Sequence, residues 1–207
     1  MDSMTIKTVL ISLSAISCAA PLYAGQVVFT QSDFLNRYQY GHSANAIQTT
    51  VTSDEGIKFT LTIRNAKGGK VSIGNRSNNG FIAVTQGNEN RIDKGQGLTF
   101  SLAIDHGSTK RKLDKLSIGG LSYSWLNLGS PDELSQIREF RIIAKKKQTV
   151  VTGPFYDRSI RASNLGTFAH LPTDPKQLAN WKMTNILTSD CPTRFESITF
   201  NYKLSRN

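Results

Sequence analysis

Large apolar residues alternate with polar ones over several short stretches of the chain. The alternation is clearest in residues 57–63, 98–104 and 198–204, and weaker examples occupy residues 27–29, 47–51, 121–125 and 140–142. In a β-strand, successive side chains point to opposite faces, so a period of two directs one side of each stretch into a core and the other toward water. We therefore predict a chain built mainly of strands.

Clusters of glycine, asparagine and other turn-forming residues separate these stretches. They lie at residues 66–69, 75–80, 87–90, 95–97 and 119–120. Glycine and asparagine tolerate the positive φ that tight connections between strands require. Short strands at this spacing are typical of a sandwich or a barrel. We predict one all-β domain over residues 25–207, a single antiparallel, jelly-roll-like β-sandwich.

One part of the chain departs from this pattern. Residues 153–187 alternate poorly and contain Pro154, Pro172 and Pro175. A long irregular insertion is usually either a functional loop or a loosely packed cover, and both alternatives stay open. Helical signals are few, and we expect only short helices within residues 131–137 and 174–181.

The N-terminal residues have the three parts of an export signal. Lys7 and the α-amino group are positive, residues 8–20 carry no charge, and Ala24 is a small residue before the polar chain begins. The apolar run is shorter than the roughly 20 residues that a membrane-spanning helix needs. We predict that residues 1–24 are a signal peptide cleaved after Ala24, and that the protein is secreted or periplasmic, without a membrane span.

The two cysteines are compatible with a signal peptide cleaved after Ala24, but Cys18 also allows a lipoprotein as an alternative. Residues 15–18 loosely resemble a bacterial lipobox, in which Cys18 would become lipid-modified, although Ala15 stands where leucine is usual. Cleavage after Ala24 would leave Cys191 alone, so no intramolecular disulfide is expected. Cys191 is then either an inert thiol or a site of intermolecular pairing.

The charge of the chain is strongly positive. There are 25 Lys and Arg residues against 15 Asp and Glu residues, a formal net charge of +10. Two clusters, residues 110–112 and 145–147, contain only basic residues. Such an excess favours anionic partners through long-range attraction. The basic residues lack the interleaved aromatics of a stacking platform for single-stranded nucleic acid, so no specific nucleic-acid binding is expected.

No catalytic, metal-binding or cofactor motif stands out. The chain lacks the HExxH, CxxC and G-x-S-x-G motifs, and its glycine-rich stretches do not open a helix as a phosphate loop does. Residues 87–93 gather oxygen ligands that calcium prefers, but they lack EF-hand spacing and also fit a plain polar turn. A glycosidase would need two carboxylates facing each other across a cleft. The candidates are Glu89, Asp93, Asp105, Asp132, Glu133, Asp157 and Glu196. We predict no metal and no cofactor.

Aromatic residues beside cations are the remaining functional candidates. Trp181, Tyr156, Arg158 and Arg161 all lie in the irregular segment. An aromatic ring next to a cation can hold an acidic sugar by stacking and charge pairing, and these four residues are the predicted ligand contacts. Tyr38 and Tyr40, near Arg37, form a second group of this type. The alternative for Trp181 is that its ring plugs the segment onto the core.

Residues 79–104 (NGFIAVTQGNENRIDKGQGLTFSLAI) and 195–200 (FESITF) resemble a group of Gram-negative exported β-sandwich proteins, many of which carry an exosortase sorting tail. The resemblance implies a jelly-roll-like sandwich and an extracellular or periplasmic location. Residues 203–207 offer none of the sorting tail's features, so sorting by that route is not implied.

Together these features predict an exported, non-catalytic binding protein. The favoured partner is an anionic glycan or matrix polysaccharide, or another cell-surface polyanion. Two alternatives stay open, a secreted polysaccharide-cleaving enzyme and a structural surface or matrix protein. The sequence does not determine the oligomeric state.

Overall fold

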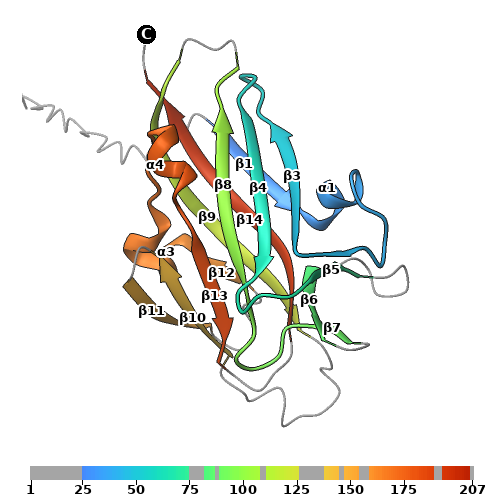
Figure 1. The fold of residues 1–207 in the computed structure, drawn as a ribbon. Coiled ribbons are helices and arrows are strands. Elements are labelled where there is room, and N and C mark those ends of the chain that lie inside the picture. The colour runs from blue at the N-terminus through green and yellow to red at the C-terminus, as the bar shows by residue number, and fades with distance from the viewer. Residues whose placement is uncertain are drawn as a thin grey trace, which may run out of the picture.

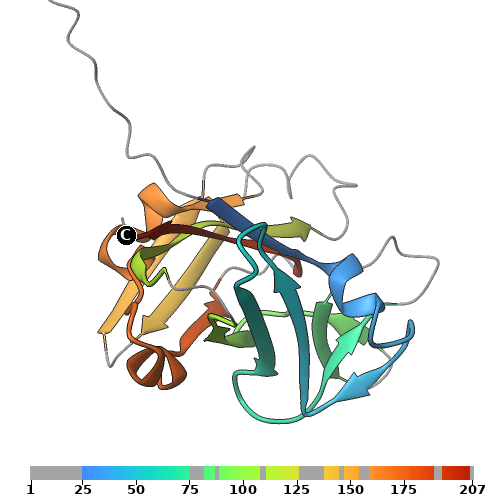
Figure 2. The same ribbon diagram turned by 90° about the horizontal axis from the view of Figure 1, so that it is seen from above.

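A computed structural model describes residues 25–74, 82–86, 89–107, 111–125, 138–144, 147–153, 159–188 and 193–205. Over these residues the chain forms two antiparallel sheets packed face to face (Figure 1). Seen from above, β1, β9 and β14 lie in one layer, and β3, β4 and β8 lie in the other (Figure 2). The predicted all-β sandwich is confirmed. The predicted signal peptide and Cys191 lie outside the described residues.

The larger sheet is organised around the last strand, β14 (Thr193–Leu204). One edge of β14 pairs with the long strand β9 (Leu113–Trp125), while the other pairs with β1 (Gly25–Thr30) and, through Phe195, with β6 (Ile82–Gln86). The other strands of this sheet are β12 (Ser159–Arg161), β5 (Val71–Ile73), β2 (Ser43–Ala44) and β7 (Glu89–Arg91).

The second sheet contains six strands in the order β11-β10-β13-β8-β4-β3. Their bounds are β11 (Lys147–Gly153), β10 (Arg138–Ala144), β13 (Met183–Leu187), β8 (Gly97–Asp105), β4 (Lys58–Asn65) and β3 (Ala46–Thr52). The three clearest alternating stretches of the sequence fall on β4, β8 and β14, as predicted. Their large apolar residues are buried, apart from the half-buried Ile104, because each strand turns one face inward.

Short helices complete the chain: α1 (Gln31–Leu35), α3 (Ala162–Leu165), the 3-10 helix η2 (Gly166–Ala169) and α4 (Pro175–Ala179). The helix predicted within residues 174–181 is therefore confirmed as α4, whereas residues 131–137 lie outside the described part. The segment that sequence alone left irregular is made of β12, α3, η2, α4 and β13 where it is described.

Aromatic side chains join the two layers. The rings of Phe100 on β8 and Phe195 on β14 lie 5.1 Å apart between centroids, and those of Phe59 on β4 and Tyr202 on β14 lie 5.2 Å apart. Ring pairs at these separations add about 0.5–1.5 kcal/mol beyond the burial of their area. The core therefore lies between the sheets and depends on contacts between residues far apart in sequence.

One buried hydrogen bond also crosses the core. Asn185 Nδ2 on β13 donates to Tyr123 Oη on β9 over 2.7 Å, and both side chains are buried. Since removing one partner leaves a buried polar group unsatisfied, we expect Tyr123→Phe to lower the free energy of unfolding by about 1–3 kcal/mol. Urea unfolding measures this change. Tyr40→Phe, at an exposed tyrosine, serves as the control and should change little. Equal stability of the two variants would contradict the prediction.

A second tyrosine gives the fold a dependence on alkaline pH. Burial, followed by the hydrogen bond that its hydroxyl donates to Glu55, raises the pKa of Tyr202 to about 12, whereas an unperturbed tyrosine titrates near 10. The unfolded chain thus loses this proton first as pH rises. The stability from the protonated hydroxyl is complete below pH 10 and decreases between about pH 10 and 12. We expect Tyr202→Phe to show a shallower loss of unfolding free energy across this window. Equal slopes in the two proteins would contradict the assignment.

Candidate binding cleft

The cleft forms where the irregular segment meets the outer edge of β9. The Leu171 N–H donates to the Leu116 carbonyl over 3.0 Å, and Ser117 forms an isolated antiparallel bridge with His170. Residues that face each other across such a pair bring their side chains close together. Ser117 is buried here, whereas His170, which directly follows η2, is exposed.

Helix α4 forms the opposite side of the cleft. Asp174 is its N-cap, and its Oδ1 accepts from the Gln177 N–H over 3.0 Å. Pro175 follows at the first helical position, where the missing N–H is not needed. Leu178 is buried on the inner side of the helix, which fixes α4 against the sandwich. The cap and this apolar anchor therefore hold Asp174 and Gln177 in place.

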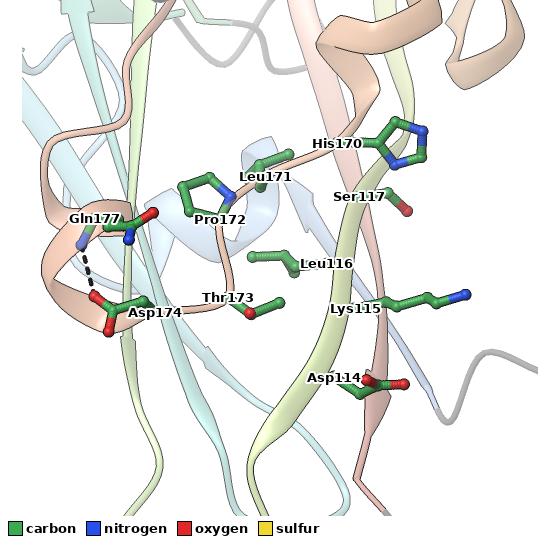
Figure 3. Close-up of a pocket in the computed structure, with 10 residues that line it drawn as sticks. All are labelled: Asp114, Lys115, Leu116, Ser117, His170, Leu171, Pro172, Thr173, Asp174 and Gln177. Carbon is green, nitrogen blue, oxygen red and sulfur yellow. Dashed lines mark hydrogen bonds between the residues drawn. The ribbon is translucent and has the colours of Figure 1, made fainter.

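The cleft has a volume of about 620 Å³, within the range of small-molecule sites. Figure 3 shows the residues from β9 on one side and those from α4 on the other, with the chain between η2 and α4 joining them. The lining residues are Asp114, Lys115, Leu116, Ser117, His170, Leu171, Pro172, Thr173, Asp174 and Gln177.

The lining combines an apolar floor with many hydrogen-bonding groups. Leu116 and Leu171 are buried and Pro172 is half-buried. Lys115 provides donors, the carboxylates provide acceptors, and the hydroxyl, imidazole and amide groups can do either. Asp114 and Lys203 form an exposed ion pair with an N–O distance of 3.8 Å, a contact too weak to fix either side chain. The cleft can therefore contact a ligand that has both apolar faces and many hydroxyl groups.

The predicted ligand contact Trp181 is buried rather than exposed. Its side chain is only 2% exposed and belongs to the hydrophobic core. The Trp181 N–H donates to the Leu178 carbonyl over 2.8 Å, so the residue stays close to the end of α4, just after its C-cap Asn180. A ring in this position offers no open face on which a sugar could stack. Its place matches the alternative, a plug that holds the irregular segment onto the core.

The other predicted contacts are only partly described. Arg161 is exposed at the end of β12, where it precedes α3, and it does not line the cleft. Tyr156 and Arg158 lie outside the described residues. Of the basic clusters, Arg111 and Lys112 are described and exposed. In the second aromatic group, the Tyr38 ring stacks on His42 with centroids 4.6 Å apart, and Tyr40 is exposed.

The carboxylates of the cleft are not the ones that the sequence suggested. Among the described candidates, Asp93 pairs with Arg91, Asp105 accepts from the Gly107 N–H and Glu196 accepts from the Ser122 hydroxyl. The cleft instead contains Asp114 and Asp174. In the described ranges, no three His, Cys, Asp or Glu side chains group closely enough to hold a metal ion.

Comparison of the chain with protein-family models, curated proteins and solved structures finds no match. Among the helices that the structure describes, none has the length and apolar character needed to cross a membrane.

Proposed function

We propose that the protein is an exported, non-catalytic binding protein for an anionic glycan or matrix polysaccharide, and that the cleft between β9 and α4 is its contact site. The cleft itself is the observation that carries the proposal, because its apolar floor and dense hydrogen-bonding groups suit a sugar. The net charge of +10 supports an anionic rather than a neutral polymer.

The lining gives each part of the cleft a role in this proposal. The C–H faces of a sugar ring would pack on Leu116, Leu171 and Pro172, and its hydroxyl groups would bond to Asp174 and Gln177. Lys115 would pair with an acidic group of the sugar. In the cleft lining, two carboxylates outnumber this cation. Attraction of the polymer would therefore come from the whole protein, and the cleft would determine which sugar is held.

Retention on immobilised polymers tests this function. Acidic polysaccharides, neutral polysaccharides and DNA would be compared at low and high salt. We expect retention on one class of acidic polysaccharide that persists at high salt, because contacts in a shaped cleft are screened less than exposed charges. Retention on every polyanion that vanishes with salt would mean that charge alone acts, and would overturn the proposal. Self-association without saturable binding of an oligosaccharide would favour a structural matrix protein.

A polysaccharide-cleaving enzyme is the second candidate, because Asp114 and Asp174 share one cleft. Two carboxyl groups across a cleft are the minimum for glycoside hydrolysis. In the structure, the Asp174 carboxylate caps α4 and that of Asp114 contacts Lys203. Release of reducing ends from an acidic polysaccharide, lost in both Asp114→Asn and Asp174→Asn, would establish the enzyme. Binding without release favours the non-catalytic function.

A further inference from the structure

The first residue of β1 lies against a polar site at the end of the sandwich. Gly25 pairs in register with Tyr202. A Cβ atom built on Gly25 would overlap the Tyr202 hydroxyl and lie 2.8 Å from the ring atom Cε1. The Gly25 backbone therefore rests directly on the hydroxyl end of this side chain, and only a glycine fits there without moving it.

Two acidic residues act on that hydroxyl, and the Ser53 side chain also hydrogen-bonds to it. Tyr202 Oη donates to Glu55 Oε2, and Asp54 also acts on Tyr202 through its charge. Arg111 is the cation that acts on Glu55. Burial opposes ionisation of Glu55, but hydrogen bonds from Tyr202, from its own backbone and from Ser53, with the charge of Arg111, lower its pKa overall. The carboxylate is thus held ionised beside the start of β1.

We propose that Gly25 is the first residue of the mature protein and that its α-ammonium group binds at Glu55 and Tyr202. The proposal goes beyond glycan binding and rests on the predicted signal peptide. A signal peptidase would add water across the Ala24–Gly25 peptide bond, leaving a carboxylate on Ala24 and an amine on Gly25. The amine takes up a proton at neutral pH.

The geometry explains why this group would bind there. The α-nitrogen is one bond from the Gly25 Cα, and a Cβ on that same atom would overlap the Tyr202 hydroxyl. The Glu55 carboxylate accepts from that hydroxyl, Asp54 also acts on the hydroxyl through its charge, and Arg111 acts on Glu55. A positive charge added beside the hydroxyl would be attracted by these two carboxylates. In the unprocessed chain, the same nitrogen is a neutral amide, so export processing would itself create the interaction.

The first test is the start of the exported protein. The full chain would be expressed with its own leader in an exporting host, and the N-terminus of the purified product would be determined by sequencing and intact mass. We expect the chain to begin at Gly25. A product that begins elsewhere, or retains residues 1–24, would overturn the proposal.

The second test measures the contact of the ammonium group. Selective transamination of the α-amine with pyridoxal 5′-phosphate replaces that group by a neutral carbonyl and leaves the lysines unchanged. We expect the melting temperature of the exported protein to decrease by about 2–4 °C on this treatment. In Glu55→Gln the treatment should have little effect, because the ionised partner is gone.

Glu196→Gln provides the matched control. Glu196 lies on β14, the strand that also carries Tyr202, but beyond the opposite end of β1. Its carboxylate accepts from the Ser122 hydroxyl. Transamination should lower the melting temperature of this variant as much as that of the natural protein. An equal decrease in Glu55→Gln, or none in the natural protein, would overturn the proposed contact. Polysaccharide retention is a separate readout, so either proposal can fail alone.

Discussion

Trp181→Ala should lower the free energy of unfolding by about 3–5 kcal/mol, the cost of removing a large aromatic ring from a core. The side chain is 2% exposed and lies between the buried residues Leu178 and Met183 in the sequence. Its loss would leave a cavity beneath α4, since the helix is too short to hold its position without tertiary contacts. Denaturant unfolding followed by circular dichroism measures the change.

The matched control is Tyr40→Ala, which removes an exposed aromatic ring and should alter stability little. Trp181→Phe keeps most of the apolar volume and should cost less than the alanine variant. If Trp181→Ala kept normal stability but lost polysaccharide retention, the ring would be a ligand contact after all, the other alternative that the sequence leaves open.

Gly97→Ala is expected to be the most damaging small substitution in the described sheets. Gly97 pairs with Ile186 where β8 meets β13. A Cβ atom there would overlap the Asn185 carbonyl oxygen and lie 2.9 Å from Ile186 Cα. Backbone atoms in a paired strand cannot rotate away, so the cost should reach or exceed the upper end of the usual 1–3 kcal/mol for overpacking. Chemical denaturation would show the loss, or the variant would fail to fold.

Gly120→Ala serves as the comparison for this prediction. Gly120 also lies in a paired strand, β9, but a Cβ atom at this position would have the Ile160 carbonyl oxygen as its nearest neighbour, at an ordinary 3.8 Å. We expect its stability to change by no more than about 1 kcal/mol. Equal stability of the two variants would show that β8 and β13 can separate to admit a methyl group.

The fold could be predicted because its signals are local. Seven residues of alternation are enough to identify β4, β8 and the second half of β14, because the apolar positions of each stretch indicate which face of the strand is buried. Glycine- and asparagine-rich turns then separate the strands. The sandwich follows, because a sheet that is apolar on one face must bury that face against another layer.

The cleft could not be predicted in the same way, because it depends on a distant contact. Residues 114–117 and 170–177 come together only through the bridge of Ser117 with His170 and the packing of α4. The sequence leaves open whether Trp181 contacts a ligand or plugs its segment onto the core, because nothing near it in sequence indicates which layer covers it. Of the cleft itself, the sequence indicates only the short helix that begins near Asp174 and forms one side.

Under the proposed function, the cleft, rather than overall charge, holds an acidic polysaccharide. Two lysine variants test it most directly: Lys115→Gln removes an exposed cation from the cleft lining, and Lys112→Gln removes another exposed cation outside it. Both variants lower the net charge equally, so a purely electrostatic interaction would weaken to the same extent in each. We expect Lys115→Gln alone to elute from the retaining polysaccharide at clearly lower salt, with Lys112→Gln close to the natural protein. Equal elution of the two variants would contradict the account.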